Sequence, residues 1–278
     1  NLLWRDLHVR NVERVTRAGK NSSKTNNIRI DIVVDGVTHE TAWSCGLEFD
    51  YANEESFYCR PLRIDPDGKN RMPVPDQAGV VSVAFLPPMS GLADREFVKQ
   101  PGEVGVLIGQ GQTAQVLRNL CYQVHEQGHH WDELVRYIQA LFGVEHLRPR
   151  YIAERGEIVM SYKDEHGHDL GLSSSGRGLQ QTLLLLAHLY ANPGAVLLLD
   201  EPDAHLEILR QRQTYNLLIE IAGQQGSQII AASHSEIVLA EAAGRDVVIA
   251  FVGAPHRIDD RGSQVLKSLR DIGFDQYY

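Results

Sequence analysis

The sequence predicts an α/β fold in which a mainly parallel sheet is flanked by helices. The first observation is that short apolar runs alternate with longer amphipathic stretches over residues 151–278. Apolar strands that alternate with such helices indicate a parallel sheet covered on both faces. The other two are strand-like patterns over residues 1–86 and helical spacing over much of residues 87–150. We therefore expect a β-rich part, a helical segment and an α/β part with these boundaries.

The α/β part is expected to begin with a strand and to alternate from there. The turn Asn192-Pro193-Gly194 separates a helical pattern from an apolar run, because proline and glycine interrupt regular elements. Ligands of parallel sheets bind at the C-terminal ends of the strands, so functional side chains are expected there. The expected strands cover residues 158–162, 195–200, 228–232 and 247–252, and the expected helices cover residues 179–190, 207–223, 236–242 and 263–272.

The β-rich part is expected to contain a hairpin. Weak alternation over residues 28–34 leads into Asp35-Gly36, a pair typical of tight turns, and then into residues 37–43. Further strands are expected at residues 47–51, 57–64 and 80–86.

The middle segment is expected to be mainly helical. Residues 113–127 and 131–142 have helical spacing, and a glycine-rich stretch at residues 102–111 precedes them. Neither helix shows sustained heptads, which argues against a long coiled coil.

The composition is typical of a soluble globular chain. The 278 residues are 43% hydrophobic, which is enough for one large core or two modest domains. No apolar stretch reaches the length of a membrane span. The three cysteines form no CxxC pair, so we expect reduced thiols in a cytoplasmic protein. The net charge of −9 argues against a nucleic-acid surface over the whole chain, although a local basic patch stays open.

The most informative motif is residues 196–207, which read VLLLDEPDAHLE. Its apolar run ends in the acidic pair Asp200 and Glu201. An Asp at the C-terminal end of a strand can hold Mg²⁺ beside ATP phosphates. The Glu beside it can orient the attacking water or take its proton. An ordinary buried strand that ends in an acidic turn is the alternative.

Two further segments lie on either side of this motif in the sequence. Residues 172–181, LSSSGRGLQQ, place small residues at the start of an expected helix, where free N–H groups and the helix dipole favour a phosphate. The alternative is that the serines only cap the helix. Residues 229–235, IIAASHS, end an apolar strand next to His234, whose imidazole can donate to a phosphate near neutral pH.

In this order, the three motifs resemble those of ATP-binding-cassette (ABC) ATPases, a class of P-loop ATPases. Their wording is similar to the OLD/RecF/SMC branch, and within it to OLD-type ATPases, including those of anti-phage systems such as PARIS. Transporter cassettes usually carry LSGGQ and DEPTxxLD instead. The close match covers roughly residues 170–240, and residues 85–150 match more loosely. The resemblance implies an ABC-type P-loop ATPase fold with ATP and Mg²⁺ as cofactors.

The resemblance also implies a role for each motif residue. Asp200 would be the metal ligand, Glu201 would activate water, and His234 would contact the γ-phosphate of ATP. In this class the serine-rich signature binds the γ-phosphate of ATP held by a partner subunit, and the D-loop after the acidic pair crosses the dimer interface. The residues implied at this shared, nucleotide-binding interface are Ser174, Ser175, Gly176, Arg177, Asp203 and His205. For His205, capping of the next helix or plain exposure is the alternative.

A cassette ATPase also needs a phosphate loop of the form GxxxxGK[ST]. The near-matches at residues 19–21 and 68–70 read GKN and lack the hydroxyl residue. We therefore expect this chain to be an interior piece of a longer protein whose phosphate loop lies upstream of Asn1. A degenerate ATPase that binds no nucleotide is the alternative, and the intact acidic pair and His234 argue against it.

The resulting hypothesis is an ATPase module that hydrolyses ATP to ADP and phosphate across a head-to-tail homodimer or a higher homo-oligomer. Its expected context is anti-phage defence or a DNA-linked process. One alternative is an ATP-gated scaffold that holds an effector protein, such as a nuclease or a toxin, with incidental turnover. Another is a RecF-like DNA-repair ATPase, although the acidic composition does not indicate DNA binding. No membrane partner is expected.

Overall fold

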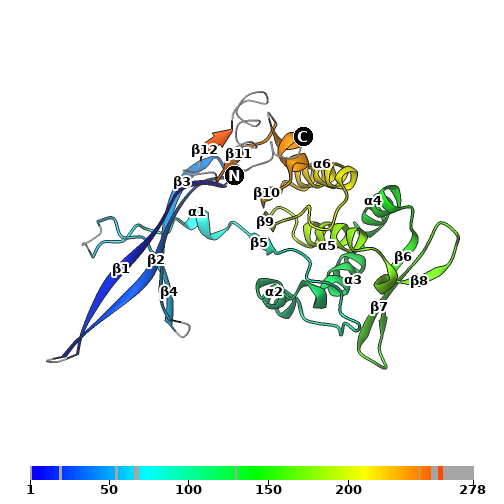
Figure 1. Ribbon diagram of the computed structural model, residues 1–278, viewed down its shortest axis with the longest axis horizontal. Helices are drawn as coiled ribbons and strands as arrows, with labels where there is room; N and C mark the ends of the chain where they lie inside the picture. Colours follow the sequence, from blue (N-terminus) through cyan, green and yellow to red (C-terminus); the bar gives the residue numbers. More distant parts are fainter. Residues whose placement is uncertain are drawn as a thin grey trace, which may run out of the picture. The chain divides into compact units, whose positions relative to one another are not determined.

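The computed structural model describes residues 2–18, 21–53, 56–65, 69–128, 130–243, 245–251 and 256–258. The chain forms two units, Asn1–Ser82 and Val83–Tyr278, and each is described by itself (Figure 1). The helix expected at residues 263–272 lies outside the described residues. The division into residues 1–86, 87–150 and 151–278 stays a prediction.

The first unit is the β-rich part and contains a four-stranded antiparallel sheet. Each strand pairs with the one that follows it in the sequence, so short turns suffice to connect them. The elements are β1 (Leu2–Ala18), β2 (Asn21–Thr38), β3 (Thr41–Asn53), β4 (Ser56–Pro61) and the short helix α1 (Asp76–Gly79).

The prediction of a hairpin turn at Asp35-Gly36 is wrong. Strand β2 continues past this pair, and the turn falls at His39 and Glu40, whose φ angles are 47° and 63°. Gly36 pairs with Trp43 across the ladder, and a Cβ atom at Gly36 would lie 2.1 Å from the Trp43 ring. Glycine is therefore required here because the indole lies against the backbone, and not because the chain turns.

The second unit contains a three-stranded parallel sheet in the order β10-β9-β5. The strands are β5 (Val83–Leu86), β9 (Val196–Asp200) and β10 (Gln228–Ala232). Both neighbours of β9 pair with it in parallel. The loops that follow these three strands therefore leave from the same edge of the sheet, which is where ligands of such sheets bind.

Helices and two small antiparallel sheets complete the described residues of the second unit. The helices are α2 (Pro101–Gly109), α3 (Leu117–Gln127), α4 (Trp131–Phe142), α5 (Arg177–Ala191), α6 (Ile208–Gln225) and α7 (Glu236–Ala242), with short 3-10 segments at Thr113–Gln115 and Leu172–Ser174. The remaining strands are β6 (Glu145–Ile152), β7 (Glu157–Lys163), β8 (Asp169–Gly171), β11 (Val248–Ala250) and β12 (His256–Ile258). None of the helices in the described ranges is both long and apolar enough to span a membrane.

Helix α5 is the central helix of the second unit and contacts α3, α4 and α6 (Figure 1). Every side chain from Leu179 to Tyr190 is buried, so the helix is enclosed on all sides. Full burial of each leucine contributes about 1.5–3 kcal/mol. Burial also lowers the pKa of His188 to about 4, so this imidazole is neutral at pH 7. The core therefore fixes α5, and α5 carries the serine-rich motif at its start.

Candidate functional site

The acidic pair lies at the C-terminal edge of the parallel sheet, as the sequence predicts. Asp200 is the last residue of β9 and is exposed. Glu201 follows with a φ of 47°, and its backbone N–H donates to the carbonyl of Ala232 at 2.8 Å. Such a left-handed conformation costs a non-glycine residue about 1–3 kcal/mol and is found preferentially at functional sites. The chain thus holds Glu201 in a strained position beside the end of β10.

The structure brings Glu201 and His234 together. Oε1 of Glu201 lies 3.2 Å from Nδ1 of His234, although the two residues follow different strands. The side chains are 43% and 78% exposed, respectively. Even a contact between full charges contributes only about 0–1 kcal/mol to stability when it is exposed to this degree. The contact therefore leaves both groups accessible to a ligand at the sheet edge.

A second contact joins the loop after β9 to the loop after β10. Ser233 donates its hydroxyl hydrogen to Oδ1 of Asp203 at 2.5 Å, and its oxygen accepts from the backbone N–H of Ser235 at 3.0 Å. Asp203 is only 6% exposed. Asp203 thus contacts its own chain, while its predicted place at a dimer interface stays a prediction. Ser233 was missed by the sequence analysis, although its position beside His234 was a signal.

Ser235 anchors the other side of His234. Its Oγ accepts from the backbone N–H groups of Ile237 and Val238 at 3.2 and 3.3 Å, which caps the start of α7. The same hydroxyl donates to Oε1 of Gln211 on α6 at 2.7 Å. His234 therefore projects from a segment that is fixed on both sides.

The serine-rich motif precedes α5, and its serines differ in their surroundings. Ser175 donates to the carbonyl of Leu172 at 2.7 Å and is half-buried. Ser174 and Arg177 are exposed, and the N-cap residue is Gly176, with no side chain that caps the helix. The first N–H groups of α5 therefore receive no side-chain cap, and exposed Ser174 is better placed than Ser175 to reach a ligand there.

The start of α5 also packs against the predicted D-loop of the same chain. A Cβ atom at Gly178 would lie 3.3 Å from the carbonyl oxygen of His205. His205 itself has a φ of 64° and an exposed side chain. Glycine at residue 178 thus permits the close approach of the two segments, and the His205 imidazole is accessible.

The residues at the sheet edge fit a metal ion that arrives with a nucleotide. Within the described residues, no three His, Cys, Asp or Glu side chains gather into a metal site. Mg²⁺ at nucleotide sites is usually bound by one or two carboxylates, water and the phosphates themselves. Exposed Asp200, with Glu201 directly after it, supplies carboxylates of this kind at the end of β9.

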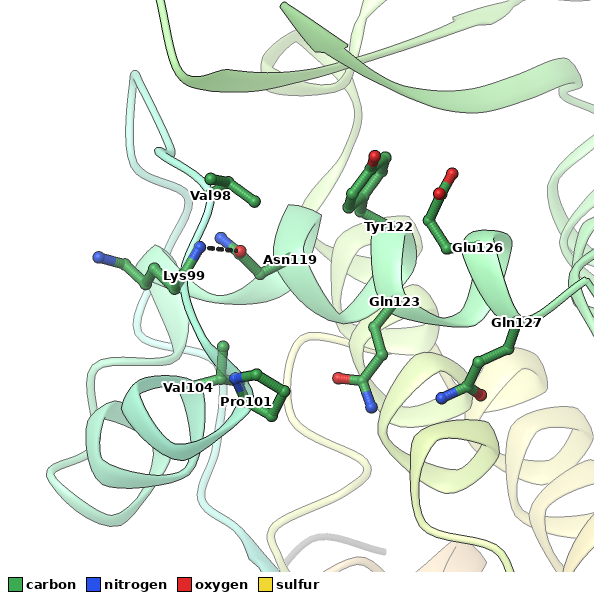
Figure 2. A pocket seen from close by; sticks show the side chains of 9 residues that line it. All are labelled: Val98, Lys99, Pro101, Val104, Asn119, Tyr122, Gln123, Glu126 and Gln127. Atoms are coloured by element: carbon green, nitrogen blue, oxygen red, sulfur yellow. Dashed lines mark hydrogen bonds between the residues drawn. The ribbon is translucent and has the colours of Figure 1, made fainter. Parts of the chain in front are cut away.

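A separate hollow of about 320 Å³ lies between the segment at residues 98–104 and helix α3 (Figure 2). The side chain of Asn119 accepts from the N–H of Lys99 at 2.8 Å and donates to the carbonyl of Phe97 at 2.9 Å. The ammonium of Lys99 pairs with Glu103 at 2.8 Å. None of the residues that line the hollow belongs to the sheet edge, so the hollow is separate from the candidate site.

Buried Glu96 anchors the chain near this hollow. Its two carboxylate oxygens accept from the backbone N–H groups of Arg118 and Asn119 at 3.0 and 2.6 Å, at the start of α3. Burial raises the pKa of Glu96, and these hydrogen bonds oppose the rise because they favour the ionised form. The carboxylate thus serves the helix start and is not part of the sheet-edge site.

The parallel sheet, the acidic pair at the end of β9 and the histidine just after β10 are features of an AAA-type ATPase domain. A family described as "AAA domain, putative AbiEii toxin, Type IV TA system" matches residues 87–240. This match covers more than half of the 278 residues, so the chain belongs to that family. The predicted fold class, an α/β P-loop ATPase with a β-rich N-terminal part, is confirmed, and the OLD and PARIS subtypes stay predictions. No curated protein matches the sequence.

Several solved structures show a distant likeness. The SMC head domain from Thermotoga maritima has 18% identity and a TM-score of 0.45, and the match covers 86% of this chain and 76% of that one. An Smc head domain from Pyrococcus furiosus, with an extended coiled coil and bound to the C-terminal domain of ScpA, has 12% identity, coverage of 91% and 82%, and a TM-score of 0.44. An SmcHead bound to the C-winged helix domain of ScpA has 13% identity, coverage of 86% and 76%, and a TM-score of 0.46.

Proposed function

We propose that this chain is the hydrolytic part of an ATPase that converts ATP to ADP and phosphate. The observation that carries the proposal is the 3.2 Å contact between Glu201 and His234 directly beside Asp200, at the edge of the sheet where ligands bind. Membership of the AAA-domain family supports the same conclusion.

Each side chain has one task in this proposal. Asp200 would hold the Mg²⁺ that accompanies ATP, and that ion would supply positive charge beside the phosphates. Glu201 accepts a proton from the water that attacks the γ-phosphorus, while ADP leaves with the electron pair of the broken P–O bond. His234 donates a hydrogen bond to a γ-phosphate oxygen, and its contact with Glu201 keeps acceptor and donor within reach of the same phosphate. No GxxxxGK[ST] phosphate loop occurs in residues 1–278, so the proposal assigns that role to none of their side chains.

We also propose that the start of α5 completes the site of a second copy in a head-to-tail homodimer or a higher homo-oligomer. The helix start has no side-chain cap, and its small residues leave the backbone N–H groups approachable. Exposed Arg177 adds a positively charged side chain three residues after exposed Ser174. A γ-phosphate presented by the second copy matches this arrangement in charge and in hydrogen-bonding capacity.

The experiment is to measure Mg²⁺-dependent ATP turnover by the full-length protein and its Asp200→Asn variant. We expect a loss of ~10²-fold or more, because a catalytic metal ion supplies several kcal/mol of charge stabilisation. Asp169→Asn is the matched control, since Asp169 is an exposed carboxylate on β8, and this variant should keep the parent rate. Turnover by the Asp200 variant at the parent rate, or no turnover by the parent protein, contradicts the proposal.

A second candidate role is a nucleotide-gated scaffold that holds an effector protein, such as a nuclease or a toxin. The family description names a putative toxin of a type IV toxin–antitoxin system. In that role, ATP binding alone drives assembly and turnover is incidental. A Glu201→Gln variant that fails to hydrolyse ATP but still protects cells against phage favours the scaffold, whereas loss of protection favours the ATPase cycle.

A further inference from the structure

We propose that Gln181 is a positioning residue that couples the start of α5 to the acidic loop, so that an event at the helix start changes the geometry of Glu201. The inference rests on the proposed ATPase function and names an element of its regulation. It is carried by two contacts of one buried side chain, each of which reaches a different loop at the C-terminal edge of the sheet.

The amide of Gln181 joins the loop after β5 to the loop after β9. Its Oε1 accepts from the backbone N–H of Met89 at 3.2 Å, and its Nε2 lies 3.5 Å from the carbonyl oxygen of Pro202, to which it donates. The side chain is 1% exposed, so water does not compete for these groups. The orientation of the amide follows from the partners, because only its oxygen can accept from Met89 and only its nitrogen can donate to Pro202.

The contacts continue from Pro202 to the third loop of the site. Pro202 directly follows Glu201, and the next residue, Asp203, accepts from Ser233 at 2.5 Å beside His234. The loops after β5, β9 and β10 are thus connected in that order, and Gln181 is the side chain that reaches from α5 into them.

Gln181 also lies one turn after Arg177, at the exposed start of the same helix. Its neighbour Gln180 faces the other way along the motif and donates to the carbonyls of Leu172 and Ser175 at 3.2 and 3.1 Å. Gln180 therefore contacts the motif before the helix, and Gln181 contacts the loops after β5 and β9. Because the core encloses α5 on all sides, a displacement at the helix start reaches Pro202 through a rigid element.

The test compares three variants of the full-length protein. Gln181→Leu removes both contacts in a side chain of similar size. Gln181→Glu keeps an acceptor for the N–H of Met89, but it places a carboxylate oxygen, which cannot donate, against the carbonyl oxygen of Pro202. The control is Thr182→Val, because Thr182 is fully buried on the same helix and its hydroxyl has no partner among the described residues.

We expect both Gln181 variants to lower kcat by roughly 10- to 100-fold, since a misplacement of about 1 Å can cost 10²-fold in rate. The KM for ATP should change by less than about 3-fold, because the residue positions the reacting groups and does not bind ATP. In Gln181→Leu, the backbone amides of residues 201, 203–205 and 233–235 should exchange hydrogen faster than in Thr182→Val.

If Gln181 has a purely structural role, kcat should fall only as far as Tm falls. Gln181→Leu and a control variant of the same Tm would then have the same kcat, and that result overturns the proposal. If the parent protein hydrolyses no ATP, the ATPase function fails, and hydrogen exchange alone decides the coupling. Unchanged exchange at residues 201, 203–205 and 233–235 in Gln181→Leu then overturns it.

Discussion

The contact between Asp203 and Ser233 predicts a measurable coupling energy between the two loops of the site. Asp203 is 6% exposed, and the hydroxyl of Ser233 is the donor at 2.5 Å from its carboxylate. A hydrogen bond to a charged group contributes about 1.5–3 kcal/mol, and solvent screens a buried carboxylate little. We therefore expect Asp203→Ala and Ser233→Ala to be non-additive, with a coupling energy of ~1.5–3 kcal/mol in a double-mutant cycle.

The assay is equilibrium unfolding of the full-length protein and of the three variants in urea. Each single variant should also lower Tm by about 3–12 °C, because 1 kcal/mol corresponds to ~2–4 °C in a domain of 150–250 residues. Ser173→Ala is the control, since Ser173 is exposed and the change should cost less than ~0.5 kcal/mol. Additive effects of the two variants, with a coupling energy below ~0.5 kcal/mol, would refute the reasoning that this contact joins the loops.

Three further predictions concern assembly, pH and nucleotide binding. Arg177→Glu should weaken ATP-dependent association by ~10-fold or more, seen by sedimentation with a non-hydrolysable analogue, because a like charge then faces the phosphate; unchanged association contradicts the proposed interface. Burial and the hydrogen bond to Asp246 raise the pKa of Tyr215 to about 12. The stability that this shift contributes is fully present below pH ~10, the pKa of an unfolded tyrosine, and should be lost as the pH rises to 12. The decline in stability should be smaller in Tyr215→Phe; identical pH profiles of unfolding in the two proteins argue against this role of Tyr215. The chain of residues 1–278 alone should bind ATP weakly or not at all in calorimetry, and micromolar affinity would mean that another loop holds the phosphates.

The elements that the sequence predicted best are those with strong local signals. Strand β10 and helices α4 and α7 have the predicted bounds. A branched apolar run bounded by polar residues defines β10, and Ser235 provides a cap at the start of α7. Strand β9 ends at Asp200 as predicted, because the acidic residues that follow an apolar run mark its exit from the core.

Helix α2 was missed because its glycines argue locally against a helix. Gly102 and Gly105 lie within it, and each glycine costs about 1 kcal/mol relative to alanine. The helix forms nevertheless, since Pro101 suits its first turn and Val104 and Ile108 are buried in the core. Tertiary packing overrides local propensity here, and a single sequence contains no direct signal for it.

The candidate site was predicted in part. The motifs located Glu201 and His234, and adjacent parallel strands bring them to 3.2 Å, although their catalytic roles stay predictions. The buried contacts of Asp203 and Gln181 could not be predicted, because they depend on how loops from distant parts of the chain meet. The sequence of a helix does not indicate which loop the side-chain amide of a glutamine within it will contact.

The measurement that tests the central claim most directly is ATP binding and single-turnover hydrolysis by the full-length protein and its Glu201→Gln variant. The contact between Glu201 and His234 is exposed, so the substitution should change stability by less than about 1 kcal/mol. We expect ATP binding to persist and hydrolysis to fall by ~10²–10⁴-fold, which is the usual cost of removing a general base. Hydrolysis by the variant near the parent rate would contradict the assignment of Glu201 and, with it, the proposed site.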